Sequence, residues 1–346
     1  MIRSQLSDLL SLLRPISIGV FGDFCLDAYW QLDETNPELS LETGKPTLAV
    51  AQQRYSPGGA GNVVNNLAAL GVGKVCALGV LGDDLFAGEM LRHFGEISTD
   101  ITGLIRQHSE WQTCVYAKPY RGSEELSRVD FGRFNTLSGE SERKLIAAIT
   151  AEISHLDALV VNQQIPRSLF TSAVVEALND LASQYPKKVF LLDSRSKVNV
   201  FRSMICKVNA IEAAALFGKR IERNEECASD ELSDYAKRLF DRFRKPVFIT
   251  RSRLGLLFFD GIGTVEIPAV YNEGPIDAVG AGDTVVAAIA AALAAGANPH
   301  QAGSLAMIAS AITVGKLRQT GTATPKEMLD LVDTLSDLSS NPRRNS

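Results

Sequence analysis

One segment of the chain, residues 277–284 (DAVGAGDT), combines small residues with two carboxylates. It directly precedes residues 285–293, which are almost wholly apolar and strongly helix-forming. Small residues let several backbone N–H groups converge on one point, and a helix N-terminus adds about half a positive charge there. Phosphate is the natural ligand of such a turn, so the segment predicts a phosphate site.

Of these two carboxylates, Asp283 lies at the start of the helix and so in the field of its N-terminus. We expect the positive end of the helix to favour its ionised form and so keep it available for a hydroxyl proton. A carboxylate beside an anion hole suits phosphoryl transfer. The alternative is that Asp283 only caps a buried helix while the glycines allow close packing, and the turn alone does not separate these interpretations.

The elements that must position this turn alternate between strand and helix. Buried strands are predicted at 16–21, 75–80, 158–162, 189–193, 206–209 and 247–250. Helices are predicted near 140–154, 168–185, 211–217, 230–243, 283–295, 299–316 and 325–338. This rhythm predicts an α/β fold with a mostly parallel central sheet between two helical layers, an α/β/α sandwich. A hairpin is expected over 254–267.

Two segments depart from that rhythm. Residues 28–55 and 112–131 are polar and contain extended pieces, and we expect them to leave the main layers. Residues 57–61 (PGGAG) read as a glycine-rich turn that leads into a helix from Asn62. The last residues, 339–346, are predicted to be a disordered tail behind a single domain over 1–338.

Composition excludes several classes of function. The 346 residues include 35 basic and 40 acidic side chains, a net charge of −5, which argues against a general nucleic-acid-binding face. Five cysteines without paired spacing indicate reduced, packed thiols, and four scattered histidines give no metal or triad pattern. No apolar run reaches membrane-spanning length, so we expect a soluble cytoplasmic protein with no membrane partner.

Four motifs, in order along residues 16–330, resemble those of the ribokinase-like (PfkB) carbohydrate kinases. They are residues 57–62 (PGGAGN), 209–212 (NAIE), 250–255 (TRSRLG) and 277–283 (DAVGAGD). Four motifs in family order are far more specific than any one of them. The resemblance implies a ribokinase-like fold, with the two departing segments paired as a small β-sheet lid over the sugar site.

The resemblance also implies a kinase mechanism. Asp283 would be the general base, with the amides of Gly280, Ala281 and Gly282 forming the anion hole. Asn209 and Glu212 would bind the nucleotide and hold Mg²⁺ with ATP, Glu212 through water, although the same pair is also an ordinary helix cap. Thr250 and Gly255 would line the nucleotide pocket. Asp277 is a candidate ligand for a monovalent cation such as K⁺.

The sugar site implied by the resemblance lies near the N-terminus. Its residues would be Asp23, Asp27, Gly58, Gly59 and Asn62. Residues 22–30 (GDFCLDAYW), 126–131 (LSRVDF) and 314–317 (VGKL) resemble heptose 7-phosphate kinases within the family. Lys118 and Arg128 could then pair with a phosphate that the substrate already carries; solvated surface charge is the alternative.

Departures from the heptose kinases leave the substrate open. Residues 36–43 replace a more apolar, proline-rich stretch, and Val279 stands where threonine is usual. Heptose phosphate, pentose, ketohexose and nucleoside all stay open, as does a non-catalytic sugar or nucleotide sensor. The chain lacks the phosphate loops of dehydrogenases and of P-loop kinases. We also predict a homodimer formed through an apolar face of the lid, with Leu39, Leu41, Val115 and Tyr116 as candidates.

Overall fold

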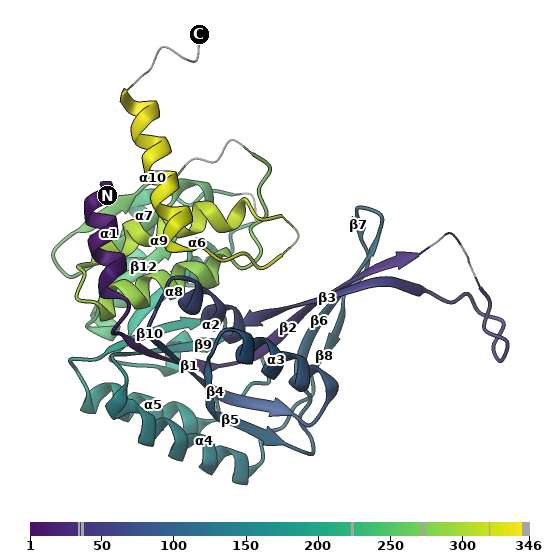
Figure 1. Ribbon diagram of the computed structural model, residues 1–346. Helices are drawn as coiled ribbons and strands as arrows, with labels where there is room; N and C mark the ends of the chain where they lie inside the picture. The colour runs from purple at the N-terminus through teal and green to yellow at the C-terminus, as the bar shows by residue number, and fades with distance from the viewer. Residues whose placement is uncertain (34, 36–37, 223–224, 271–273, 318, 341–346) are drawn as a thin grey trace.

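The computed structural model describes residues 1–33, 35, 38–222, 225–270, 274–317 and 319–340 (Figure 1). The helices are α1 (Arg3–Leu12), α2 (Ala60–Ala69), α3 (Leu85–Glu96), α4 (Gly139–Glu152), α5 (Ser172–Gln184), α6 (Ala210–Leu216), α7 (Ser229–Phe243), α8 (Ala281–Ala294), α9 (Pro299–Val314) and α10 (Pro325–Ser340). Each predicted strand and helix is present, with bounds moved by a few residues.

A nine-stranded sheet forms the centre of the molecule, in the order β14-β13-β12-β11-β10-β9-β1-β4-β5. Its strands are β1 (Ser17–Gly22), β4 (Lys74–Gly82), β5 (Asp100–Gln107), β9 (Ala158–Gln163), β10 (Val189–Ser194), β11 (Ile205–Asn209), β12 (Val247–Thr250), β13 (Leu256–Phe259) and β14 (Thr264–Ile267). The β12–β13 and β13–β14 pairs are antiparallel, and every other pair of neighbours in this sheet is parallel. The sheet therefore brings the carboxyl ends of β1, β9, β10 and β11 to one edge, where α/β proteins bind ligands.

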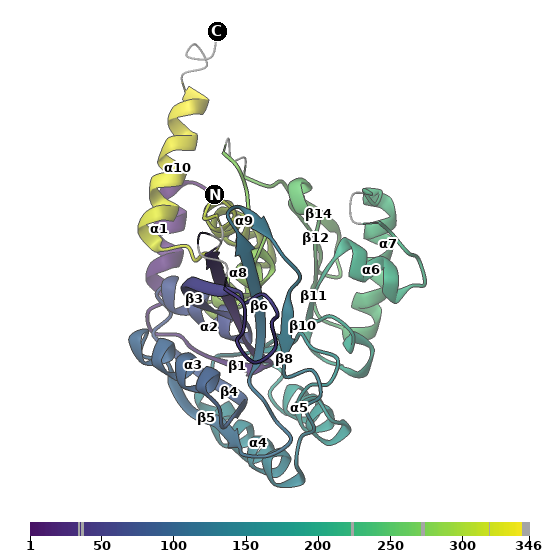
Figure 2. The same cartoon turned by 90° about the vertical axis from the view of Figure 1, so that its right-hand side faces the viewer.

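Helices cover both faces of this sheet, as Figures 1 and 2 show. Alternate strand residues face opposite layers: Val20 belongs to the core that contains buried residues of α2, α8 and α9, whereas Phe21 belongs to the core that contains those of α4 and α5. Helix α8 is buried on nearly all sides, which explains its apolar sequence. The predicted α/β/α sandwich is confirmed.

A second, smaller sheet extends away from the body (Figure 1). It contains β2 (Phe24–Asp33), β3 (Ala49–Gly59), β6 (Cys114–Arg121), β7 (Glu124–Glu125) and β8 (Val129–Phe131). Strand β2 pairs with β3 in antiparallel and with β6 in parallel orientation. The two departing segments of the sequence thus form one sheet, which includes residues outside the predicted ranges.

Several local predictions are wrong. Residues 57–59 end strand β3 instead of forming a turn, because Gly58 and Gly59 pair with Cys25 and Phe24 of β2. Strand β5 was not predicted, since its sequence is mostly polar. Of the tail predicted as disordered, residues 339 and 340 continue α10, and 341–346 lie outside the described residues.

The exposed face proposed for dimerisation is only partly present. Leu41 is 96% exposed, but Val115 is fully buried within the molecule and so was a wrong candidate. All five cysteines are free and buried, as predicted. Among the described residues, no helix is both long and apolar enough to cross a membrane.

Candidate active site

Two cavities meet where the central sheet, the second sheet and the start of α8 come together. Cavity A, approximately 660 Å³, is lined by Cys25, Asp27, Gly59, Tyr116, Lys118, Arg128, Gln164, Asp193, Arg195, Lys207, Asn209, Glu212, Asp277, Ala278, Val279, Gly280, Gly282, Asp283 and Thr320. Cavity B, approximately 720 Å³, is lined by Lys207, Asn209, Ala210, Ile211, Glu225, Glu226, Cys227, Leu232, Thr250, Arg251, Ser252, Arg253, Leu254, Ala278 and Gly282. Lys207, Asn209, Ala278 and Gly282 belong to both, so they mark the passage between the cavities.

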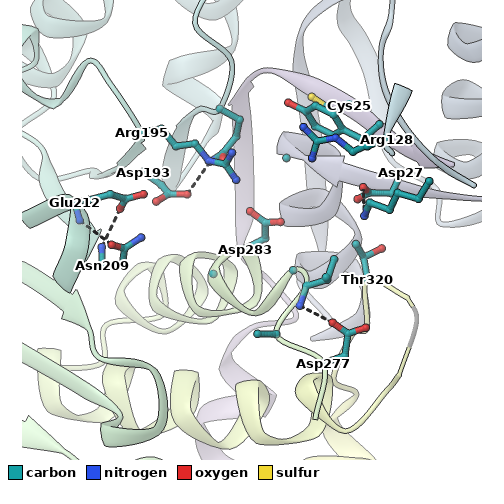
Figure 3. Close-up of a pocket in the computed structure, with 18 of the residues that line it drawn as sticks. Cys25, Asp27, Arg128, Asp193, Arg195, Asn209, Glu212, Asp277, Asp283 and Thr320 are labelled. Atoms are coloured by element: carbon teal, nitrogen blue, oxygen red, sulfur yellow. Dashed lines mark hydrogen bonds and ion pairs between the residues drawn. The ribbon is translucent and has the colours of Figure 1, made fainter. Parts of the chain in front are cut away.

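Asp283 lies in the first turn of α8, close to this passage. Figure 3 shows it with Asp193, Asn209 and Glu212 on one side and Asp27 and Arg128 on the other. Burial raises the pKa of Asp283 from 3.8 to about 7, and the nearby charge of Asp193 adds to the rise. The expectation that the helix end favours the ionised form is wrong in direction, because removal from water outweighs it. Asp283 instead titrates near neutral pH.

A chain of hydrogen bonds holds the Asp283 carboxylate. Asn62 Nδ2, from the first turn of α2, donates to Asp283 Oδ2 at 2.9 Å. Asn66 Nδ2 donates to Asn62 Oδ1 at 3.1 Å, and Thr284 Oγ1 donates to Asn66 Oδ1 at 2.9 Å. Asn62, Asn66 and Thr284 are buried, so the chain fixes the orientation of both amides. Asn62 therefore lies against the carboxylate and outside the lining of cavity A.

The turn before Asp283 has the backbone shape that the sequence indicated. Gly280 caps α8 with a φ of 79°, and a Cβ there would lie 2.6 Å from Asn62 Nδ2, so only glycine fits. Gly280 and Gly282 line cavity A. The amide of Ala281 donates to the carbonyl of Ala278 at 3.2 Å. This turn bond engages the Ala281 N–H, so the place of Ala281 in the anion hole stays a prediction.

Strand ends contribute an ion pair that the sequence reading missed. Lys207 Nζ, on β11, lies 3.0 Å from Asp193 Oδ1, on β10, and both side chains are more than nine-tenths buried. Asn162 and Gln164 each donate to Asp193 Oδ2 at 3.1 Å. Burial lowers the pKa of Lys207, but the negative charges of Asp193 and Glu212 raise it by more than burial lowers it. The pKa of Lys207 is therefore raised above its ordinary value, and the lysine stays charged. The available signal was a charged residue at the end of each apolar strand.

Asn209 and Glu212 form a capping box at the start of α6. Asn209 Oδ1 accepts from the Glu212 amide at 2.8 Å, and Glu212 Oε2 accepts from the Asn209 amide at 2.9 Å. Burial raises the pKa of Glu212. Both side chains line cavity A, and Asn209 also lines cavity B. The helix-cap interpretation is therefore confirmed, and it places both side chains where a ligand would meet them.

On the opposite wall, Asp27 of β2 pairs with Lys118 of β6. Lys118 Nζ lies 2.7 Å from Asp27 Oδ1, and each side chain is 10% exposed. A Cβ on Gly58 would lie 2.9 Å from Asp27 Oδ2, so glycine leaves room for this carboxylate. Asp27, Lys118 and Gly59 line cavity A, whereas Gly58 lies behind Asp27.

Two arginines also line cavity A. Arg128 donates two hydrogen bonds to the Asp130 carboxylate, at 2.6 and 3.0 Å, and its guanidinium lies 4.3 Å from the centre of the Tyr116 ring. Arg195, which directly follows β10, lines the cavity but was not predicted as a site residue from the sequence. It is exposed, and within the described residues it forms no ion pair.

Asp23 lies away from cavity A, although the sequence predicted it in the sugar site. Its Oδ2 accepts from the amides of Gln164, at 2.7 Å, and Ile165, at 3.1 Å. Its side chain is buried, and burial raises its pKa to about 7. Because two amides hold it, Asp23 anchors the loop that follows β9.

The remaining predicted residues divide between the cavities. Thr250 lines cavity B. Gly255 lies behind that wall with a φ of 89°, and a Cβ there would meet the Ile267 carbonyl oxygen at 2.2 Å. Asp277 lines cavity A, and its Oδ1 accepts from the Val279 amide at 3.0 Å. The described residues contain no cluster of three or more metal-ligating acidic, cysteine or histidine side chains.

Residues 20–327 match the pattern of the pfkB family of carbohydrate kinases, and this match spans both sheets and the whole site. The chain belongs to that family. It is 31% identical over 337 residues to the bifunctional protein HldE of Trichlorobacter lovleyi, covering 95% of this chain and 65% of that protein. It is 30% identical to the bifunctional protein HldE of Coxiella burnetii over 89% of this chain and 62% of the relative. The pfkB chain thus spans slightly less than two thirds of these relatives.

Solved structures show the same fold at lower identity. Phosphofructokinase-2 of Escherichia coli, in complex with fructose 6-phosphate, matches with a TM-score of 0.69 at 18% identity over 93% of this chain and 99% of that one. The ribokinase of Arabidopsis thaliana, complexed with ribose and ATP, matches with a TM-score of 0.68 at 16% identity, over 92% of this chain and 98% of that one. These matches confirm the ribokinase-like architecture of this carbohydrate kinase.

Proposed function

We propose that this carbohydrate kinase transfers the γ-phosphoryl group of ATP to a hydroxyl of a sugar phosphate, with a heptose 7-phosphate as the first candidate. The observation that carries the proposal is the place of Asp283. It is a carboxylate with a pKa of about 7 that lines cavity A close to the passage into cavity B, at the N-terminus of a buried helix. Such a group can accept a hydroxyl proton on one side while phosphate is held on the other.

In the proposed reaction the sugar hydroxyl lies in cavity A and ATP enters through cavity B. Asp283 takes the hydroxyl proton while the sugar oxygen bonds to the γ-phosphorus and the bond to the β-phosphate oxygen breaks, releasing ADP. The Gly280 and Gly282 amides and the Lys207 ammonium, 3.5 Å from where a Gly282 Cβ would be, hold the charge of the transferred group. Thr250 and Gly255 shape the nucleotide cavity.

Mg²⁺ fits the donor set at the passage. The Asn209–Glu212 capping box uses only Oε2 of the Glu212 carboxylate. Glu212 therefore keeps its second carboxylate oxygen for a hydrated cation. Magnesium keeps several waters and binds through few carboxylates and the substrate phosphates. Bound there, it would neutralise phosphate charge. Asp277 is the proposed ligand of a monovalent cation, and the Escherichia coli phosphofructokinase-2 has a solved complex with potassium.

Asp27 and Gly59 are the proposed sugar-binding residues, because short carboxylates accept hydrogen bonds from adjacent hydroxyls and glycine lets a ring approach the backbone. The second sheet would act as a lid that excludes water from the reaction. Dimerisation through the lid is a further part of the proposal, with Leu39 (59% exposed) and Leu41, in the segment between β2 and β3, as its apolar residues. A cytoplasmic location fits ATP use and the free cysteines.

The test is ADP release from Mg-ATP across heptose and hexose phosphates, free pentoses, ketohexoses and adenosine, with Asp283→Asn in parallel. We expect turnover of a sugar phosphate that collapses in the variant. Turnover of a phosphate-free sugar alone would correct the substrate class. If ATP and a sugar bind but no acceptor reacts, the chain is a sensor and the proposal fails.

A further inference from the structure

One basic side chain of cavity A forms no ion pair within the described residues. Of its four basic side chains, Lys118 pairs with Asp27, Arg128 with Asp130 and Lys207 with Asp193. Arg195 forms no such pair there and is exposed to the cavity. A guanidinium is always charged and presents a planar fork of donors, which matches the oxygens of a phosphate. The charge inventory therefore leaves Arg195 ready for an anionic ligand.

The backbone beneath Arg195 is fixed. Its amide donates to the Gln163 carbonyl at 3.1 Å, and Gln163 Oε1 accepts from Ser194 Oγ at 2.7 Å and from the Ser196 amide at 3.1 Å. Gln163 is fully buried. Because this loop is already ordered, little backbone entropy is lost when Arg195 binds a ligand. Such preorganisation is typical of binding sites.

The charge of Arg195 reaches both the second sheet and the reaction centre. It lowers the pKa of Tyr116 more strongly than Arg128 does, although Arg128 stacks on that ring. It also acts on Asp283. In Figure 3, Arg195 lies across the cavity from Arg128, with Asp283 below and between them. Arg195, Arg128 and Tyr116 all line cavity A.

The cavity linings decide which phosphate Arg195 serves. Lys207 and Gly282 line both cavities and so face phosphates that arrive with ATP through cavity B. Arg195 lines cavity A but is not among the described residues that line cavity B. Arg195 thus faces the cavity that the proposed reaction assigns to the acceptor.

We propose that Arg195 is the specificity residue that binds the phosphate already present on the acceptor sugar, opposite Arg128 and Tyr116. The inference rests on the proposed kinase function and adds the residue that selects phosphorylated over free sugars. On the second sheet, Arg128 already spends two of its N–H donors on Asp130. The site is completed from the central sheet, so an acceptor phosphate links the two sheets.

The experiment compares the wild type with Arg195→Gln and Arg195→Lys on heptose 7-phosphate and fructose 6-phosphate and on their phosphate-free parents. We expect Arg195→Gln to raise KM for the phosphorylated acceptor about 30-fold, as loss of a charged hydrogen-bond pair does, with kcat and KM for ATP within threefold. Arg195→Lys should recover part of the loss. Arg167→Gln, an exposed arginine on the loop after β9 that lies outside both linings, should change nothing.

Other outcomes would overturn the assignment in distinct ways. A fall in kcat that is equal for phosphorylated and free sugars would place Arg195 on the transferred group, and a raised KM for ATP would place it on the donor. Calorimetry without ATP separates this proposal from the kinase itself. If no acceptor reacts, but wild type binds heptose 7-phosphate and Arg195→Gln does not, Arg195 stands and the kinase proposal fails. Equal binding by both proteins refutes the role of Arg195.

Discussion

Asp23, after β1, and Asp283, at the start of α8, have the same shifted pKa in different surroundings. Burial raises each to about 7. Asp283 lines cavity A and takes a single amide donor from Asn62, whereas Asp23 is 3% exposed and is held by two backbone amides of the loop after β9. A raised pKa therefore does not identify a base; access to a cavity does. Their substitution to asparagine should separate catalysis from loop anchoring.

The largest effect is expected from Asp283→Asn, because asparagine keeps the size of the side chain but cannot accept the hydroxyl proton. We expect kcat to fall about 10³-fold or more, while sugar phosphate still binds. Asp23→Asn should keep kcat within tenfold. Steady-state kinetics with the acceptor identified by the ADP assay measures both. Equal losses in the two variants would break the comparison.

A smaller effect on activity is expected from Gly58→Ala. This variant tests whether Asp27, and not Asp23, is the carboxylate that binds the sugar. Gly58→Ala places a methyl group 2.9 Å from Asp27 Oδ2 and must displace that carboxylate. We expect KM for the acceptor to rise about tenfold at unchanged KM for ATP. Gly88→Ala in α3, where a Cβ meets nothing within 4 Å, is the control. An unchanged KM in Gly58→Ala would exclude Asp27 from the sugar site.

The pH profile sharpens the catalytic side of the comparison. Because the base must be ionised, kcat/KM should rise with pH through the Asp283 pKa of about 7. Asn62 donates to the ionised carboxylate and lowers this pKa, so Asn62→Ala should move the midpoint up by about one pH unit and reduce the rate at pH 7 about fivefold. Asn65→Ala, on the same helix beside His93, should leave the midpoint unchanged. A midpoint that stays in place in Asn62→Ala would show that Asp283 is not the titrating group.

The sequence predicted the architecture and the main site for a common reason: both depend on local patterns. Apolar runs gave the strands, and the turn at 280–283 gave the start of α8. What it missed depends on tertiary pairing. Arg195 and Lys207 belong to the site because the parallel sheet brings the carboxyl ends of β10 and β11 to one edge, which the local sequence does not reveal. Residues 57–59 form the end of a strand because they pair with β2. The predicted direction of the Asp283 pKa shift was wrong because the burial that raises this pKa depends on the whole fold.

The smallest effect concerns stability and tests the anchoring side of the comparison. The folded pKa of Asp23, about 7, lies above its ordinary value of 3.8, so between these values the folded state holds a proton that the unfolded state has lost. Folding stability from this group therefore falls as pH rises from about 4 to 7 and stays low above 7. The upper bound of the loss is about 4 kcal/mol.

Asparagine cannot ionise and can still accept from the two amides through its oxygen. Asp23→Asn should thus come closest to the wild-type melting temperature at about pH 4 and exceed it by a few degrees at pH 8.5. Thermal unfolding followed by circular dichroism across this range measures the difference. Asp8→Asn on the exposed face of α1 controls for the change in net charge. A variant that is less stable at every pH would mean that Asp23 is ionised in the folded protein and anchors the loop through its charge.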